Sequence, residues 1–140
     1  MVVNSLNYKA VEDTIRWVKE QPNVHSISIN FHTPYAGTEE LFLDWNIRAE
    51  VIDKVLEMKR KGYQIMNSVS GLKKMKNNHF KQYCWVTNFI LPDGTRLSEC
   101  AGKTQGVCDQ CGFCMAGEIA SMFQLKPDTI LAAGKLRVKS

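Results

Sequence analysis

The sequence predicts an α/β fold, in which a parallel sheet with crossover helices is followed by a β-hairpin, a cysteine-rich loop and a short helix. Two observations lead to this prediction. Apolar residues in positions 1–80 recur with strand and helix spacing in the order strand, helix, strand, helix, strand. All five cysteines lie after residue 83, around a turn signal and two short C-x2-C spacings. The chain therefore divides into an α/β part, 1–80, and a cysteine-rich part, 81–125.

The first three elements are expected over 1–7, 9–20 and 24–32. The first is a short strand, and the second is a helix that Pro22 stops. The helix repeats its apolar residues at helical spacing, namely Val11, Ile15 and Val18. The third is a strand, because apolar and polar residues alternate along it with a period of two.

The next three elements are expected over 45–61, 63–69 and 72–79. The first is a helix with Gly62 at its end. It carries one apolar stripe, which consists of Ile47, Val51, Val55 and Met58. The second is a short strand, and the third is a basic helix. Strands that alternate with helices in this way indicate a parallel sheet with right-handed crossovers.

The strand over 24–32 has one face that is wholly polar. This face is formed by Ser26, Ser28, Asn30 and His32, and the first strand adds Asn4 and Asn7. Strands of a parallel sheet are usually buried on both faces, so a polar face needs an explanation. It is either the solvated face of an antiparallel sheet or the lumen of a barrel that holds a polar ligand. The crossover helices favour the barrel, because they would cover the outer face.

The cysteine-rich part begins with a predicted hairpin. Residues 85–91 and 95–98 are rich in strand formers, and Pro92-Asp93-Gly94 is a turn signal between them. A hairpin brings its open ends together, so Cys84 and Cys100 are expected on the same side of the molecule. The stretch GVCDQCGFCMAGE then supplies Cys108, Cys111 and Cys114.

Thiolates that converge on one point suit either a [4Fe–4S] cluster or a structural zinc ion. Zinc ribbons generally use two separated C-x2-C pairs, whereas C-x2-C-x2-C is common around iron–sulfur clusters, so the spacing favours iron–sulfur. A disulfide scaffold is disfavoured because the sequence shows no export signal, which predicts a cytoplasmic protein. An isolated cysteine is often an ordinary buried side chain, but five in one region are not. A single centre leaves one cysteine over, and the spacing does not say which.

A helix is expected over 115–123, with Met115, Ile119 and Met122 on one face. Its N-terminus would direct backbone N–H groups at an anionic, thiolate-ligated centre, although the helix also serves simply to cap the loop and pack. Residues 126–140 are expected to be a C-terminal tail.

Composition excludes several classes of function. The 140 residues carry a formal net charge of +4, and no apolar run reaches the roughly 18 residues of a membrane span. Basic residues cluster at 59–61 and 73–76, but neighbouring acidic residues offset them, which indicates a solvated helix face. We therefore expect neither a nucleic-acid nor a membrane partner.

The hairpin pattern Cys84-x9-Gly94-x5-Cys100, followed by a C-x2-C cluster and a short helix, resembles the auxiliary-cluster extension of radical SAM enzymes. This extension is called SPASM in its longer form and twitch in its single-cluster form. The stretch from MVVNSLNY through SISINFHTPYAGTEE to the strand at 63–69 is similar to the last strands of the radical SAM partial barrel. The resemblance thus covers nearly the whole chain and implies the C-terminal portion of such an enzyme, with residues 1–80 as the remnant of a partial parallel (β/α) barrel.

The resemblance also implies functional residues. Cys84 and Cys100 would ligate an auxiliary [4Fe–4S] cluster together with two of Cys108, Cys111 and Cys114. The polar strand residues would face S-adenosylmethionine or substrate, and His32 is either catalytic or an ordinary hydrogen-bonded loop histidine. The C-x3-C-x2-C loop that holds the catalytic cluster in this family is absent. Cleavage of S-adenosylmethionine would therefore need a missing N-terminal half, and no catalytic residue is assigned.

The residue patterns leave other partners and classes of function open. The chain would pair with an N-terminal radical SAM half, with an electron donor or with a second copy of itself. Alternatively, it is a zinc-stabilised interaction module without redox activity, or a small electron-transfer subunit of a separate enzyme.

Overall fold

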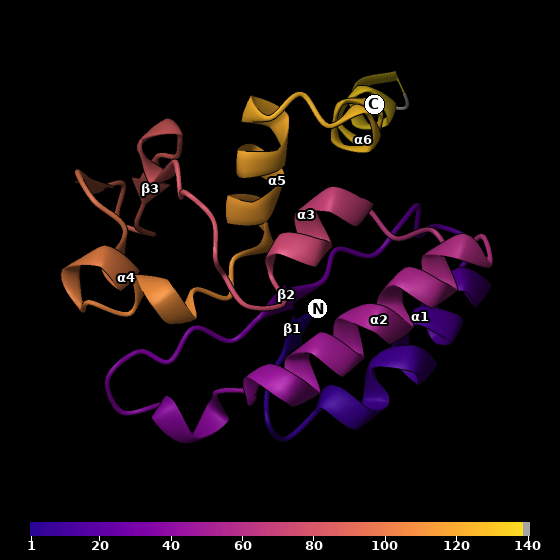
Figure 1. Ribbon diagram of the computed structural model, residues 1–140, viewed down its shortest axis with the longest axis horizontal. Coiled ribbons are helices and arrows are strands. Elements are labelled where there is room, and N and C mark those ends of the chain that lie inside the picture. Colours follow the sequence, from indigo (N-terminus) through magenta and orange to yellow (C-terminus); the bar gives the residue numbers. More distant parts are fainter. Residues whose placement is uncertain (139–140) are drawn as a thin grey trace.

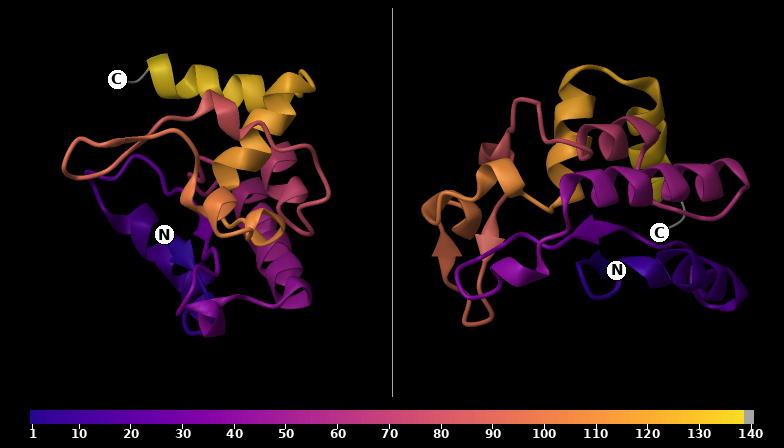
Figure 2. Two further views of the ribbon diagram at one scale, coloured as in Figure 1. Left: turned by 90° about the vertical axis from the view of Figure 1, so that its left-hand side faces the viewer. Right: turned by 60° about the horizontal axis from the view of Figure 1, so that its bottom comes forward.

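The computed structural model, which describes residues 1–138, is mixed α/β, with many helices and only short strands (Figure 1). Helices α1 (Val11–Glu20) and α2 (Trp45–Arg60) run alongside each other at one end of the molecule. The cysteine-rich part lies at the opposite end (Figures 1 and 2). Helix α5 (Cys114–Phe123) stands between the two ends.

Three extended segments run parallel, as the alternating pattern predicts. Strand β1 (Val2–Val3) pairs with β2 (Asn30–Phe31), and α1 connects them. A single parallel bridge then joins Ile27 to Ile65, and α2 forms that connection. Parallel α/β connectivity is therefore present, but regular strands cover far fewer residues than the 1–7, 24–32 and 63–69 expected from sequence.

The strands are short because of what lies on the edge of β2 that faces away from β1. There, a side chain and a loop take the place of a neighbouring strand. The side chain of Asn67 accepts a hydrogen bond from the Ile29 N–H at 2.8 Å and donates one to the Ile29 carbonyl at 3.0 Å. The next N–H along this edge, that of Phe31, donates to the Gly112 carbonyl at 2.8 Å. Buried backbone groups must find partners, and here they find them outside a regular ladder.

Helices α1 and α2 follow the predicted boundaries closely. Asp44 caps α2 by accepting a hydrogen bond from the Asn46 N–H at 2.9 Å, and Gly62 follows its end with a φ of 88°. The stripe residues Val51, Val55 and Met58 are buried, as their spacing predicts. They contribute to one continuous core, whose other members include Val3, Val11, Ile15, Ile27, Ile29, Phe31, Ile52, Leu72 and Met75.

Helix α3 (Val69–Lys74) begins earlier and ends earlier than the basic helix expected over 72–79. The hydroxyl of Ser68 caps it by accepting from the Gly71 N–H at 2.9 Å. Helix α5 packs closely across it, because Gly71 and Gly117 meet at the crossing. A Cβ on Gly117 would lie 2.5 Å from the Gly71 carbonyl oxygen, which no side chain tolerates.

Most of the region expected to be a tail is helix α6 (Pro127–Val138), while residues 139–140 lie outside the described part. Asp128 accepts hydrogen bonds from the backbone N–H and hydroxyl of Ser70, both at 2.7 Å. The hydroxyls of Thr129 and Ser68 are 2.9 Å apart. A proline followed by an acidic residue is a recognised helix start, so the sequence held a signal for α6.

The predicted hairpin is confirmed. Strands β3 (Phe89–Ile90) and β4 (Arg96–Leu97) pair antiparallel, with Phe89 opposite Leu97, and Gly94 in the turn has a φ of 85°. A single helical turn, α4 (Ala101–Thr104), follows the hairpin. The predicted helix over 115–123 corresponds to α5.

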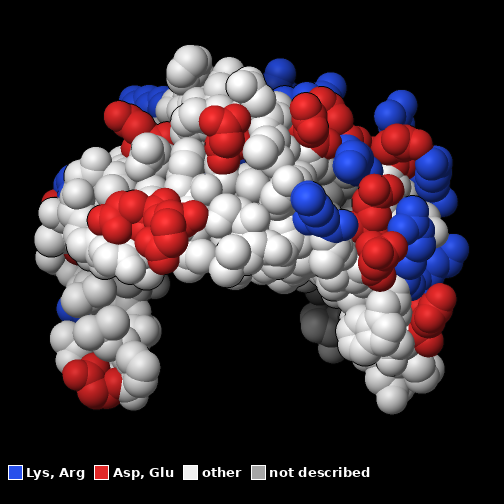
Figure 3. Space-filling view, turned by 90° about the horizontal axis from the view of Figure 1, so that it is seen from below, with Lys and Arg blue, Asp and Glu red and all other residues white. Residues whose placement is uncertain are grey.

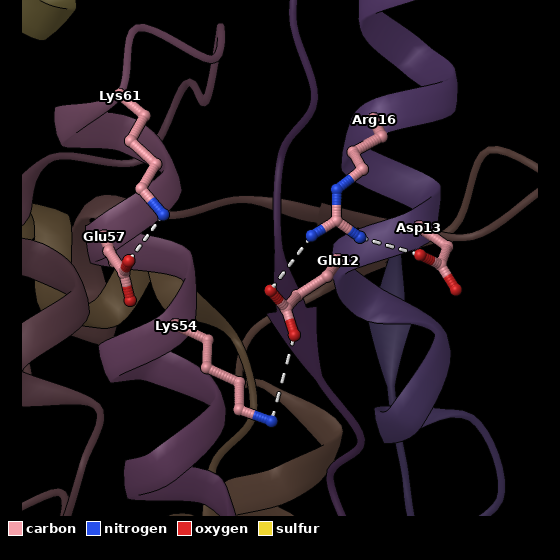
Figure 4. Close-up of polar contacts among 6 residues, drawn as sticks. All are labelled: Glu12, Asp13, Arg16, Lys54, Glu57 and Lys61. Atoms are coloured by element: carbon pink, nitrogen blue, oxygen red, sulfur yellow. Dashed lines mark hydrogen bonds and ion pairs between the residues drawn. The ribbon is translucent and has the colours of Figure 1, made fainter.

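Figure 3 shows a hollowed face on which charged side chains of both signs interleave along the right-hand side. Glu12 contacts Arg16 of its own helix α1 at 3.4 Å and Lys54 of α2 at 3.9 Å, while Glu57 and Lys61 pair at 2.6 Å at the end of α2 (Figure 4). Solvent screens these exposed pairs, so they contribute little to the stability of the fold. Among residues 1–138 there is no helix with the length and apolar character needed to cross a bilayer.

Candidate metal centre

Each cysteine lies at the beginning of a short helical segment or directly beside one. Cys84 and Cys108 open 3-10 turns, Cys100 directly precedes α4, and Cys114 is the first residue of α5. Cys111 follows the second of these 3-10 turns directly. All five, which fall within the described residues, are free thiols. Helix starts carry unpaired N–H groups that favour anionic sulfur nearby, which applies to all of these cysteines except Cys111, at the end of its turn.

Three of these thiols share one cavity of about 240 Å³, to which Cys84, Cys100 and Cys111 all contribute. The hairpin supplies one wall, and the start of α5 supplies another. The remaining lining residues are largely apolar or aromatic, namely Tyr83, Thr87, Asn88, Phe89, Phe113, Met115, Ala116 and Ile119. The cavity therefore combines soft sulfur donors with a largely apolar lining.

The other two cysteines are placed differently. Burial raises the pKa of Cys108, and charge on the nearby Cys100 raises it further, while charge on Cys108 in turn raises the pKa of Cys84. Cys114 is only 1% exposed and lies on the side of α5 that faces Arg48 and Glu118. Cys84, Cys100, Cys108 and Cys111 thus form one group, whereas Cys114 is set apart from the cavity.

Backbone N–H groups point at two of the sulfur atoms. The Gly102 N–H donates to Cys100 Sγ, with the nitrogen 3.3 Å from the sulfur. The Phe113 N–H donates to Cys111 Sγ and lowers the pKa of that thiol. In both cases the donor lies two residues after the cysteine. Hydrogen bonds of this kind stabilise thiolate over thiol, and they tune sulfur-ligated metal centres.

Burial opposes ionisation of the thiols in the absence of a metal. It is the largest cause of the raised pKa values of Cys84, Cys108 and Cys111, and it raises the pKa of Cys114 to about 12. Within the described residues, no three Cys, His, Asp or Glu side chains are positioned to hold one metal ion. The sulfur donor set fits a thiolate-ligated centre, but loading would require the thiols to close in and release their protons.

The cysteine loop is held against the α/β part by side chains that donate to its carbonyl groups. Gln82 donates to the Cys108 carbonyl at 2.9 Å, and Asn78 donates to the Asp109 and Cys111 carbonyls at 3.1 and 2.8 Å. A further donor to the Cys111 carbonyl is Arg48 Nη2, at 2.9 Å. The loop therefore keeps its shape through contacts that do not involve its sulfur atoms.

Gly112 brings the loop into direct contact with β2. Its N–H donates to Thr33 Oγ1 at 2.9 Å, and its carbonyl accepts from Phe31. A Cβ at this position would lie 1.9 Å from the Phe31 carbonyl oxygen. Only glycine fits so close a backbone approach.

The loop that follows β2 also contacts the cysteine region. The Ala36 N–H donates to Gln105 Oε1 at 2.9 Å. The pKa of Tyr35 is raised, first by burial and then by the nearby Cys100 and Cys111. The carboxyl end of β2 therefore faces the thiol cavity.

Of the six polar residues predicted to bind a cofactor, one meets the cysteine loop. Asn30 Oδ1 accepts a hydrogen bond from the Cys114 N–H at 3.0 Å, so Asn30 caps the beginning of α5. Ser26 instead lines a separate cavity of about 490 Å³ beside Lys59 and Asp128. Ser28 is half-buried, and its carbonyl accepts from the Met1 amino group at 2.7 Å.

The remaining polar residues are engaged locally. His32 Nε2 lies 3.0 Å from the Thr38 hydroxyl and 3.1 Å from the Thr38 carbonyl. Asn4 and Asn7 bond each other's backbone in a turn, and Asn7 also donates to the Val2 carbonyl at 2.9 Å. Their predicted role in binding a cofactor stays a prediction.

Sequence reasoning missed Arg48, whose side chain is completely buried in α2. A signal was present, because Arg48 precedes Val51, Ile52 and Val55 at the spacing of the apolar face. A cation on the buried face of a helix needs a partner inside the protein.

Comparison with protein-family models, with curated proteins and with solved structures gave no match to this chain.

Proposed function

We propose that this chain binds one [4Fe–4S] cluster through four cysteines and acts as the C-terminal portion of a radical SAM-type enzyme. The observation that supports the proposal is the shared cavity, which three thiols line together with largely apolar side chains. Two of those sulfur atoms already receive backbone N–H groups. Sulfur donors and N–H···S contacts are what iron–sulfur clusters require of a protein, and the surrounding apolar side chains tune such centres.

The ligands in this proposal are Cys84, Cys100, Cys108 and Cys111. Cys84, Cys100 and Cys111 line the cavity, and Cys108 lies in electrostatic contact with Cys84 and Cys100. Cys114 is the cysteine left over, because it does not line the cavity, its side chain is only 1% exposed and burial raises its pKa to about 12.

When bound, the cluster would supply one-electron transfer or an anchoring point for substrate. The chain's own residues would hold it: the hairpin and α4 position Cys84 and Cys100, and the loop before α5 positions Cys108 and Cys111. The aromatic and aliphatic lining would restrict water. Five free thiols are consistent with the reducing cytoplasm, where we place the protein.

In the same proposal, β1, β2 and the segment around Ile65 are the last strands of a partial barrel. The parallel order of these three segments supports it. S-adenosylmethionine would bind only after a partner supplies the C-x3-C-x2-C loop. That partner is an N-terminal radical SAM half, and Ser26, Ser28, Asn30 and His32 would then face the enclosed lumen.

The test is to purify the chain without oxygen and to measure its absorption spectrum together with its iron, sulfide and zinc content. We expect a brown protein with about four iron and four sulfide per chain. A colourless protein that carries one zinc ion and no iron would contradict the proposal and establish the zinc-stabilised module instead. Adding S-adenosylmethionine and a reductant separates the fragment from a complete enzyme, because we expect no cleavage by this chain alone.

A further inference from the structure

We infer that Arg48 is the buried counter-charge of the thiolate centre, acting from the α2 side of Cys111. This inference rests on the proposed function, because it assigns to a residue outside the cysteine region a role in holding the centre. It concerns how the α/β part and the cysteine part depend on each other.

The guanidinium of Arg48 is fixed in place. Its side chain has no exposed surface, and its Cζ lies 4.5 Å from the centre of the Phe31 ring and 4.8 Å from that of the Trp45 ring. Aromatic faces attract a cation, and the attraction grows where water is excluded. The two rings therefore hold the group in position and keep it charged.

The hydrogen bonds of Arg48 are only partly satisfied. Nη2 donates to the Cys111 carbonyl at 2.9 Å, while Nε and Nη1 are buried without a partner. Among the described residues, no carboxylate forms an ion pair with Arg48. A buried arginine without an acidic partner is unusual, because removing its charge from water is strongly unfavourable.

The ionisable groups that act on Arg48 are the thiols of Cys114 and Cys111. Both would raise the pKa of the guanidinium if they were charged, whereas desolvation lowers it to about 10. Protonated thiols supply no negative charge to balance the arginine. A thiolate of Cys111 that ligates a metal centre supplies it, and together with the other ligands it makes the centre anionic.

The arrangement has two opposite consequences for stability. Without metal, Arg48 is a buried charge with no anionic partner among the described residues, so the two rings and one hydrogen bond only partly offset the cost of removing it from water. With metal, the same charge lies next to an anionic centre and stabilises the loaded protein. Replacing Arg48 by an uncharged residue of similar length should therefore weaken loading without destabilising the metal-free form.

The experiment compares the full chain with Arg48→Met, Arg48→Lys and the control Arg60→Met, which changes an exposed arginine of the same helix. Zinc affinity is measured by competition with a chelator under reducing conditions. Thermal unfolding of the metal-free proteins is recorded in parallel. We expect Arg48→Met to bind zinc about 10- to 100-fold more weakly than wild type, as changes to groups around metal ligands typically do. We expect Arg48→Lys to bind with intermediate affinity and Arg60→Met to match wild type.

A second measurement uses protein reconstituted with iron and sulfide without oxygen. If Arg48 balances the charge of the centre, its removal disfavours an added electron. The reduction potential of Arg48→Met should then be more negative than that of wild type, whereas Arg60→Met leaves it unchanged.

Equal zinc affinity in Arg48→Met and wild type would overturn the inference while leaving the proposed cluster site intact. The inference is also overturned if metal-free Arg48→Met unfolds at a lower temperature and Arg48→Lys binds as poorly as Arg48→Met, because Arg48 would then serve only the fold. If the wild-type chain takes up neither zinc nor iron with sulfide, the proposed function is wrong, and this inference fails with it.

Discussion

The Phe31 N–H donates a hydrogen bond of 2.8 Å to the carbonyl oxygen of Gly112, and this contact joins the α/β part to the cysteine loop. Phe31 belongs to β2 and also packs against Arg48, while Gly112 directly follows Cys111. The position of the candidate ligands therefore depends on a strand from the other half of the chain.

Substitution of Gly112 by alanine should loosen this contact. A Cβ there would lie 1.9 Å from a backbone oxygen, so the loop must move away from β2. We expect a loss of about 1–3 kcal/mol in the free energy of unfolding, measured by urea denaturation, together with reduced iron uptake. The matched control is Gly134→Ala, because that position opens onto free space in α6 and alanine favours helix. Equal stability of the two variants would contradict the close approach.

Individual cysteine substitutions should divide into two groups. Changing Cys84, Cys100, Cys108 or Cys111 to serine is expected to abolish most of the iron-dependent absorption, because each removes a proposed ligand. Cys114→Ala should keep the wild-type absorption spectrum and iron content, since that thiol is buried away from the cavity. Loss of the cluster in Cys114→Ala, with retention in Cys108→Ser, would reverse the proposed ligand assignment.

Although Asn67 is polar, its side chain should contribute to the free energy of unfolding. Its side chain satisfies both the N–H and the carbonyl of Ile29, so Asn67→Ala leaves two buried backbone groups without partners. We expect a loss of about 1–3 kcal/mol for each group in chemical denaturation. Asn23→Ala, at an exposed position after α1, serves as the control and should change stability little. A small effect of Asn67→Ala would mean that the edge of β2 finds other partners.

Stability should also depend on pH through Glu118. Burial raises the pKa of this carboxyl above its ordinary value of 4.5, and the Ser68 N–H that donates to it at 2.8 Å only partly offsets the rise. The folded state then binds the proton more tightly than the unfolded state. Stability contributed by the protonated form is complete below the unfolded pKa and is lost as pH rises through the folded pKa.

Glu118→Gln removes that titration. The difference in unfolding free energy between variant and wild type should shift in favour of the variant as pH rises from about 4.5 through the folded pKa. Urea denaturation at several pH values measures this difference. A difference that does not change with pH would show that the carboxyl titrates alike in both states.

Local sequence patterns predicted much of the secondary structure. Helices α1 and α2, the hairpin and α5 all lie where the spacing of apolar residues and the turn residues place them, because these signals act over a few neighbouring positions. The clustering of the five cysteines along the chain likewise predicted a sulfur-rich site in its second half.

Other features could not be predicted because they depend on residues far apart in the chain. The stripe of Met115, Ile119 and Met122 was expected to define a face of α5, but Met115 and Met122 are exposed, and the buried face consists largely of small residues such as Gly117 and Ala120. This choice follows from the close crossing with Gly71 of α3, which a large side chain would block.

The sequence alone determined that five cysteines gather in the second half, and their spacing left open which four would act together. Tertiary structure decided that Cys84, Cys100 and Cys111 line one cavity while Cys114 turns toward Arg48. It also decided that side chains from α2 and from the segment after α3 hold the loop through its carbonyl groups. The physical reason is that spacing limits which thiols can meet, whereas packing of the intervening helices determines which of them do.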